Sequence, residues 1–466
     1  MRILRTSAVT IALAVAGLSA PIAAESSETS TTNASNASVT AVSNAATMAA
    51  ITSAVEADYD AYLAPLFVHF HENPELSFLE NKTAERMAAE LRATGLEVTE
   101  NVGGTGVVGL VKNGEGPLIL LRADMDGLPV KEKSGLEYAS TVTQVGQDGK
   151  EYPVMHACGH DVHITSMVGT ARQLMAMKDK WSGTLMFIVQ PAEERVGGAK
   201  AMLADGLYER FGKPDYALAF HVASVLPTGK VSAAEGIQYS SSDSVDVTVP
   251  GIGAHGASPH MGRDPVYIAS QIVTALQSIV SREIGPLSPA VITVGSFQAG
   301  SKHNIISDEA RLQLTVRSND EKVRAQLLDA IQRVATNVGK AHGLPEDLPV
   351  KVEVIEGTPV TYNDPKLARR LNNVMKRDLG EDTFQTFRQQ GMGAEDFAYF
   401  VAEELDVPGY YFAVGGTPQA AFDAQAEGGP RVPSHHSPLF KIAPRESVTL
   451  GTRAMIAAVL DLAPSS

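Results

Sequence analysis

The chain has 466 residues and an ordinary globular composition, with 44% hydrophobic and 20% charged residues. This is enough chain for one large domain or two smaller ones. The formal net charge of −15 makes nucleic acid and anionic membranes poor partners, because both repel an acidic surface.

The first 24 residues predict a secretory signal peptide, with basic Arg2 and Arg5, an apolar run over 8–18 and small residues for cleavage after Ala24. A membrane anchor is the alternative, but the run is short for a bilayer span. We therefore expect a secreted or periplasmic protein whose mature form has no membrane segment. Residues 25–48, rich in Ser, Thr, Asn and Ala, predict a flexible linker before a first helix near residue 51.

Four short apolar runs predict strands that are buried on both faces, and polar residues follow each of them. A helical pattern of apolar residues over 167–175 lies between two of these runs, as in an α/β sheet with helices on both sides. Ligands of such sheets collect at the carboxyl ends of the strands, so we expect the polar residues to meet there. The runs are 118–121, 185–189, 216–220 and 410–414.

The segment 155–163 holds three histidines, a thiol and an acid just before a predicted helix. Cys158 and His160 could bind one metal ion across a tight turn, since thiolate and imidazole are common zinc ligands. Asp161 could orient a ligand imidazole from behind. The alternative is a chance cluster in which Asp161 caps the helix and His163 faces its side.

Glu193 and Glu194 follow the second predicted strand. Two neighbouring carboxylates can divide the work of a metal site, one binding an ion and the other accepting a proton from a water molecule. The alternative is a solvated pair on the surface. His221 ends the third predicted strand, where a lone histidine is more often a satisfied structural group than a ligand.

The segment 236–345 has a different pattern, which predicts an inserted α+β module. Alternating apolar residues predict strands exposed on one side, typical of antiparallel sheet. The strands are expected at 244–249 and 311–317 and the helices at 265–281 and 322–342.

Adjacent His435 and His436 offer a last candidate ligand near the end of the chain, and either could serve. With Cys158, His160, Glu194 and His221 this makes five ligands, too many for one catalytic zinc with an open position. Two ions that share a ligand, with Cys158 the best candidate for the bridge, fit the set and leave Glu193 as the general base. A structural zinc site closed by four ligands is the alternative.

At this point the sequence resembles the metallopeptidase-related amidohydrolases, which include bacterial aminoacylases, hippurate hydrolases and plant auxin-conjugate hydrolases. The resemblance covers residues 65–455. Its motifs are His71-Glu-Asn-Pro-Glu-Leu-Ser77, Arg122-Ala-Asp-Met-Asp-Gly-Leu-Pro129, Met155-His-Ala-Cys-Gly-His-Asp161, Gln190-Pro-Ala-Glu-Glu194, Gly253-Ala-His-Gly-Ala-Ser-Pro-His260, Ala394-Glu-Asp-Phe-Ala-Tyr399 and His436-Ser-Pro438.

The resemblance implies an α/β fold with a phosphorylase/hydrolase-like di-metal catalytic domain, formed by 49–235 and 346–466. The inserted module 236–345 becomes a lid domain through which the chain forms a homodimer. The implied ions are two divalent metals per subunit, drawn from zinc, manganese, cobalt and nickel. The implied ligands are Cys158, His160, Glu194, His221 and His436, with Glu193 as the base.

The resemblance also assigns supporting residues. Asp126 and Asp161 are expected behind the ligands. His255 is expected to reach the partner subunit's site and stabilise the oxyanion, and Asn304 and Arg317 to bind the substrate's carboxylate. Ser307 and Leu314 depart from the family's pattern close to these last two.

The predicted activity is hydrolysis of the amide bond of N-acyl amino acids to a carboxylic acid and a free amino acid. A carboxypeptidase or dipeptidase on the same fold is the nearest alternative. A periplasmic binding protein that has kept the fold without catalysis is another, but the intact Glu193 argues against it.

Overall fold

The computed structural model describes residues 46–465, so the predicted signal peptide and the linker up to residue 45 lie outside the described residues. The chain is helical from residue 46, and residues 46–48 are therefore not linker as predicted. Met48, Ile51 and Val55 follow one another at helical spacing and are all buried. None of the helices within 46–465 combines the length and the apolar character needed to cross a bilayer.

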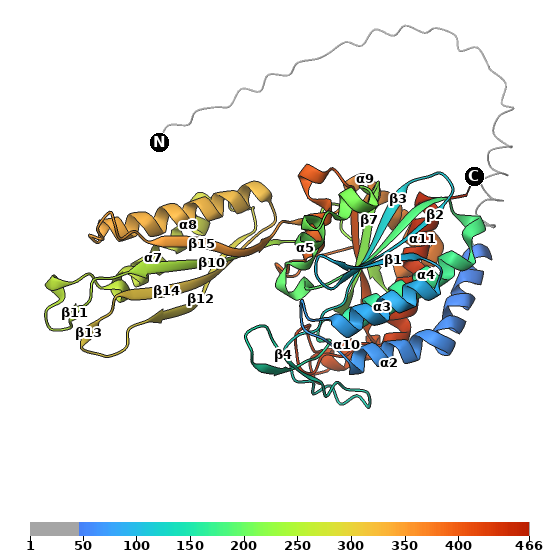
Figure 1. Ribbon diagram of the computed structural model, residues 1–466, viewed down its shortest axis with the longest axis horizontal. Helices are drawn as coiled ribbons and strands as arrows, with labels where there is room; N and C mark the ends of the chain where they lie inside the picture. The colour runs from blue at the N-terminus through green and yellow to red at the C-terminus, as the bar shows by residue number, and fades with distance from the viewer. Residues whose placement is uncertain (1–45, 466) are drawn as a thin grey trace, which may run out of the picture. The chain divides into compact units, whose positions relative to one another are not determined.

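A mixed sheet of seven strands forms the centre of the larger part of the molecule (Figure 1). β6, β3, β7 and β17 run parallel to one another and are the four predicted strands. β1, β2 and β8 pair antiparallel at the edges and were not predicted. The order is β1 (Glu97–Val102), β2 (Gly106–Asn113), β6 (Gly183–Gln190), β3 (Leu118–Asp124), β7 (Tyr216–Pro227), β17 (Gly409–Thr417) and β8 (Val231–Ser232).

Alternate residues of each central strand enter different cores, as the two-residue period of a strand requires. Leu121 and Phe187 pack into a large core, whereas Leu120 and Met186 pack into a smaller one. The sheet is thus covered on both faces, and the predicted α/β fold is confirmed. The large core contains helices α2 (Ala64–Glu72), α3 (Asn81–Ala93), α4 (His160–Ala176), α9 (Pro365–Leu379) and α11 (Pro444–Leu462), and the smaller one α5 (Gly198–Ala204) and α6 (Leu207–Phe211).

The inserted module is an antiparallel four-stranded sheet with two helices on one face (Figure 1). Val247 and Leu312 point from the sheet into a core shared with the helices. The elements are β12 (Ala290–Ala299), β14 (Glu309–Ser318), β10 (Ser241–Pro250) and β15 (Lys351–Thr358) in sheet order, with helices α7 (Pro265–Ser278) and α8 (Glu321–Ala341).

One boundary of this module was predicted too early. β15 lies beyond residue 345 but pairs with β10, so the sheet continues to Thr358. The strand was missed because it is an edge strand with only one buried residue, and it therefore lacks a long apolar run. A short antiparallel pair of β11 (Ala254–His255) and β13 (Ile305–Ile306) lies beyond the far end of the β10–β14 pair.

The remaining described elements are short. Besides short 3-10 and π-helical segments, they are β4 (Thr143–Val145), β5 (Glu151–Pro153), β9 (Ile237–Tyr239), β16 (Thr361–Tyr362) and α10 (Gln419–Ala426). The sheet places the chemistry as expected, because Asp124 ends β3, Gln190 ends β6 and the Glu193–Arg195 turn follows at once. His221 lies inside β7 rather than at its end.

Candidate active site

The turn that carries Cys158 and His160 depends on the glycine between them. Gly159 has a φ of 89° and directly precedes helix α4. A side chain there would be strained, and its Cβ would lie 2.4 Å from Val222 Cγ1. Glycine therefore allows the thiol and the imidazole to face one point from the start of the helix.

Backbone carbonyls fix the orientation of two buried imidazoles. His160 Nδ1 lies 2.8 Å from the carbonyl oxygen of Asp126, and His221 Nδ1 lies 2.7 Å from that of Val222. Because a carbonyl can only accept, each ring carries a hydrogen on Nδ1, which leaves Nε2 as the nitrogen with which the neutral ring can bind an ion. This is the usual arrangement of metal-binding histidines, and His221 Nε2 lies 3.4 Å from Cys158 Sγ.

Asp126 holds the two glutamates in place. Its carboxylate accepts the backbone N–H groups of Glu193 and Glu194, each at 3.1 Å. The turn is flanked by Ala192 at φ 49° and Val196 at φ 44°, values that side chains rarely adopt. The strained turn thus directs both glutamate side chains toward His160, whose Nε2 lies 3.8 Å and 3.9 Å from them.

All five predicted ligands meet in this cluster. Donor atoms of Cys158, His160 and His221 lie within 4.8 Å of one another, and so do those of Cys158, Glu194 and His436. Cys158 belongs to both groups, as expected of a bridging ligand. Two donors bound to one zinc ion lie roughly 3.5 Å apart, so the cluster has the spacing of a metal site.

Two buried polar atoms of the cluster lack hydrogen-bond partners among the described residues, as expected of a metal site. His160 Nε2 and Glu194 Oε1 are buried and have no hydrogen-bond partner among the described residues. Buried polar atoms are almost always satisfied. A nitrogen lone pair and a carboxylate oxygen left free at the same point indicate cation binding.

The charge balance points the same way. Burial, together with Glu395, Glu194 and Asp396, raises the pKa of Glu193 well above its usual value. Burial and then Asp126 raise the pKa of Glu194 to about 8 against the effect of His160. So many carboxyl groups in one buried place need positive charge to stay ionised.

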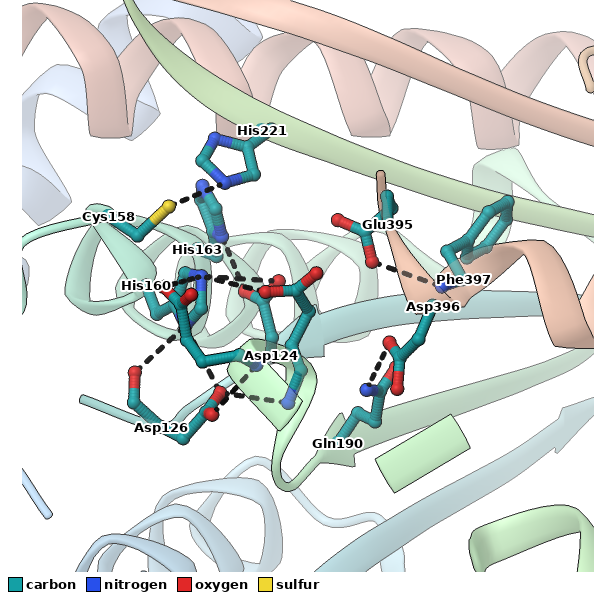
Figure 2. Close-up of polar contacts among 12 residues, drawn as sticks. Asp124, Asp126, Cys158, His160, His163, Gln190, His221, Glu395, Asp396 and Phe397 are labelled. Atoms are coloured by element: carbon teal, nitrogen blue, oxygen red, sulfur yellow. Dashed lines mark hydrogen bonds and ion pairs between the residues drawn. The ribbon is translucent and has the colours of Figure 1, made fainter. Parts of the chain in front are cut away.

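Asp124 and His163 form a supporting pair that sequence reasoning did not find (Figure 2). His163 Nδ1 lies 2.5 Å from Asp124 Oδ1, and His163 Nε2 accepts the N–H of Val222 at 2.9 Å. Both ring nitrogens are occupied, so His163 is not free to bind an ion. The Arg122 guanidinium outweighs burial and holds the pKa of Asp124 well below its usual range.

Arg122 joins this pair to a second group of acids from the distant 394–399 motif. Its Nη2 lies 2.7 Å from Glu395 and 3.2 Å from Asp396, and its Nη1 lies 2.6 Å from Asp124. Gln190 donates to Asp396 at 2.7 Å (Figure 2). The motifs were visible in the sequence, but only the fold shows that one arginine connects them.

Asp161 has a different partner from the one expected. Its carboxylate lies 2.7 Å from Nδ1 of His71 on helix α2, and His71 is not a candidate ligand. Asp161 therefore fixes the start of helix α4, which carries His160, instead of orienting a ligand imidazole directly. His156 of the same segment is buried with no hydrogen-bond partner among the described residues.

The structure distinguishes the two adjacent histidines. His436 has a φ of 64° and its Nε2 lies 3.4 Å from Glu194 Oε2. His435 instead uses Nε2 to accept the N–H of Ser224 at 3.1 Å and points Nδ1 at Cys158 Sγ, 3.7 Å away. Of the two, His436 is the one whose ring nitrogen groups with Cys158 and Glu194.

The three predicted residues of the inserted module are not all together. Asn304 lies beside His255, since the N–H of Gly256 donates to its carbonyl oxygen and Ile305 pairs with His255. Arg317 is at the other end of β14, where its Nη1 lies 3.4 Å from the carbonyl oxygen of Met392. One chain cannot bring all three to one substrate.

Two clefts reach the cluster. One of about 420 Å³ touches Glu194 and is lined by apolar residues that include Leu79 and Leu128. The other, of about 1070 Å³, reaches His435 and is lined by the aromatic rings of Tyr239 and Phe384, with no carboxylate among its lining residues. The first cleft thus opens on a glutamate of the cluster, and the second opens on the histidine that contacts Cys158.

Comparison with known proteins identifies the family. The sequence profile of Peptidase family M20/M25/M40 matches residues 120–427, well over half of the chain. The chain belongs to this family. Within it, the hippurate hydrolase of Campylobacter jejuni is 39% identical over 331 residues, covering 71% of this chain and 82% of that protein.

Two further family members mark the range of the family. Thermostable carboxypeptidase 2 of Saccharolobus solfataricus is 38% identical over 349 residues, covering 74% of this chain and 83% of that protein. The crystal structure of Bacillus subtilis YXEP, described as a dinuclear metal binding peptidase, is 27% identical with a TM-score of 0.68 and covers 86% of this chain and 98% of that one. The predicted membership of the amidohydrolases is thus confirmed.

Proposed function

We propose that this member of the M20 family is a di-metal amidohydrolase that cleaves N-acyl amino acids to a carboxylic acid and a free amino acid. The observation that carries the proposal is the meeting of Cys158, His160, Glu194, His221 and His436, with Glu193 beside them. A relative of this chain is named for the hydrolysis of hippurate, which is an N-acyl amino acid.

The roles of the residues follow from their positions. Divalent ions held by the five ligands would polarise the scissile carbonyl and acidify a water molecule. Glu193 accepts the proton of the attacking water and passes it to the leaving nitrogen. Its position suits both steps, because Asp126 accepts the backbone N–H of Glu193 and holds the side chain beside the proposed ligands.

The surroundings support a substrate with a group on each side of the amide. The two clefts give room for the acyl group and the amino acid. We assign recognition of the substrate's carboxylate to Arg317 and, from the partner subunit of a homodimer formed through the inserted module, to Asn304. His255 of that partner would stabilise the oxyanion.

A pair of neighbouring variants tests the proposal. Glu193→Gln should keep two equivalents of metal per subunit but lower kcat by about 10² to 10⁴, the usual contribution of a general base. Glu194→Gln should lose metal as well as activity. The measurements are metal content of the purified protein and turnover of N-acetyl and N-benzoyl amino acids with added Mn²⁺, Co²⁺ or Zn²⁺. Full activity of Glu193→Gln would remove the assigned base.

A carboxypeptidase activity is the second candidate, because a relative with nearly the same identity carries that name. Dipeptides and N-acyl amino acids compared side by side separate the two reactions, and the larger kcat/KM decides. If neither is cleaved by wild type or by Glu193→Gln, a binding protein without catalysis becomes the better reading.

We also propose that the protein is exported and cleaved after Ala24. The support is the order of basic, apolar and small residues in the first 24 positions. The mature protein from the native host should begin at Glu25 when its N-terminus is sequenced, and an intact Met1 would contradict export.

A further inference from the structure

We propose that His435 is a positioning residue that donates an N–H···S hydrogen bond to Cys158 and so tunes the thiolate as a metal ligand. The inference rests on the proposed metal site and extends it to a residue outside the ligand set.

The tautomer of His435 follows from its partner. The backbone N–H of Ser224 donates to His435 Nε2 at 3.1 Å. That nitrogen must therefore hold a lone pair, so the ring is neutral and its hydrogen lies on Nδ1. Nδ1 lies 3.7 Å from Cys158 Sγ, which places the hydrogen between nitrogen and sulfur.

The same geometry excludes His435 as a sixth ligand. Neither ring nitrogen has a lone pair free to face the cluster, since Nε2 is engaged with the backbone and Nδ1 carries the hydrogen. Among the described residues, no group of three potential ligands within mutual reach includes His435. It reaches the ions only through Cys158.

Packing holds the ring in this orientation. His435 lies 4.9 Å from the ring of Phe440 and 5.2 Å from that of His221, measured between centroids. Two aromatic neighbours and one backbone hydrogen bond leave little freedom to rotate. The hydrogen bond to sulfur is therefore built into the fold and does not depend on a bound substrate.

The chemical effect would follow from the role of Cys158, whose sulfur would hold both ions in the proposed site. A thiolate donates more charge to metal than an imidazole does, which weakens the ions' pull on a carbonyl. A hydrogen bond withdraws charge from the sulfur, as it does around cysteine ligands of other metal sites. His435 thus keeps the ions electrophilic.

A matched pair of variants tests this in the full-length protein loaded with Co²⁺. Asparagine can place an N–H where His435 Nδ1 stands, and leucine has nearly the same shape without a donor. His435→Leu should move the thiolate-to-cobalt charge-transfer band to longer wavelength, because the sulfur electrons are no longer stabilised. His435→Asn should return the band toward that of wild type. We expect kcat/KM to fall roughly 10- to 100-fold in the leucine variant and less in the asparagine variant.

The band positions and the Co²⁺ content together test the role of His435. Equal band positions in wild type, His435→Leu and His435→Asn would overturn the proposal, and so would loss of one Co²⁺ per subunit in both variants, which would make His435 a ligand. A wild type that binds Co²⁺ without any charge-transfer band would instead refute Cys158 as a ligand and with it the proposed site. If His435→Leu does not fold, as seen by circular dichroism, His435→Ala takes its place beside His435→Asn.

Discussion

At the scale of single residues, the protonation of His71, a buried histidine outside the ligand cluster, is unusual. Its ring lies between two carboxylates, 2.7 Å from Asp161 and 3.1 Å from Glu132. Burial alone would lower the pKa of His71, but the two hydrogen bonds outweigh it and raise the pKa to about 10. His71 therefore stays protonated at neutral pH and joins helix α2 to the start of α4.

This pairing predicts a pH-dependent stability. Since the pKa of His71 is higher in the folded state than the unfolded value of roughly 6.5, its contribution is complete below that pH and is lost as pH rises through 10. The difference in free energy of unfolding between wild type and His71→Gln should be on the order of 2 kcal/mol near pH 6 and shrink toward pH 10. Urea unfolding of the chelated protein measures it. A difference that does not change with pH would show that His71 is neutral.

The candidate ligands and Asp126 behind them could be picked out at this scale, but the other supporting contacts could not. Thiols, imidazoles and acids that follow predicted strands can be recognised as candidate ligands from their residue type and position alone. The pairing of Asp124 with His163, or of Asp161 with His71, depends on which distant elements pack together. Asp161 was accordingly expected behind a ligand and contacts another histidine instead.

At the scale of elements, the short turn before α4 decides whether Cys158 and His160 can converge. Gly159→Ala should lower the stability by about 1–3 kcal/mol, because the residue must keep a positive φ, and should reduce metal content because the new Cβ meets Val222. Gly149 is a matched control, with a φ of 77° and nothing within 4 Å of its Cβ position. Gly149→Ala should show only the backbone cost.

Urea unfolding and metal analysis of both variants check this expectation. If Gly159→Ala keeps its full complement of metal, the turn tolerates a side chain and the close approach to Val222 is unimportant for the site.

The strands were predicted to different degrees for a physical reason. β3, β6, β7 and β17 are buried on both faces and therefore read as continuous apolar runs. The edge strands β1 and β15 each bury only one residue, so burial leaves no comparable apolar run in their sequence. The end of the inserted module was misplaced for the same reason.

At the scale of the whole molecule, the inserted module separates residues that the proposed function needs together. The β10–β14 ladder continues into β11–β13, which places His255 and Asn304 beyond Glu309. Arg317 lies eight residues from Glu309 along the strand, roughly 25 Å at 3.3 Å per residue. A site that uses all three must combine two chains.

Complementation tests this. Glu193→Gln and His255→Ala should each be inactive as homodimers. In a mixed dimer, one site receives Glu193 from one chain and His255 from the other, and so regains its full set. With random pairing of equal amounts, about a quarter of wild-type activity should return.

Unchanged inactivity of the co-expressed variants would place His255 and Glu193 of each site in one chain, or remove His255 from the reaction. The motif that contains His255 predicts neither the pairing register of β10 with β14 nor the distance between His255 and Arg317. The sequence therefore indicates a second chain only through the family resemblance, whereas the strand ladder gives a geometric reason for one.

The single sulfhydryl of the chain lies where both halves of the ligand cluster meet. A reagent that modifies thiols, such as a mercurial, a maleimide dye or a chromogenic disulfide, can react with only one residue of this sequence, Cys158. The rate at which Cys158 is labelled shows whether its sulfur is already bound to a metal ion. A simple colorimetric assay can therefore follow metal binding without any substrate.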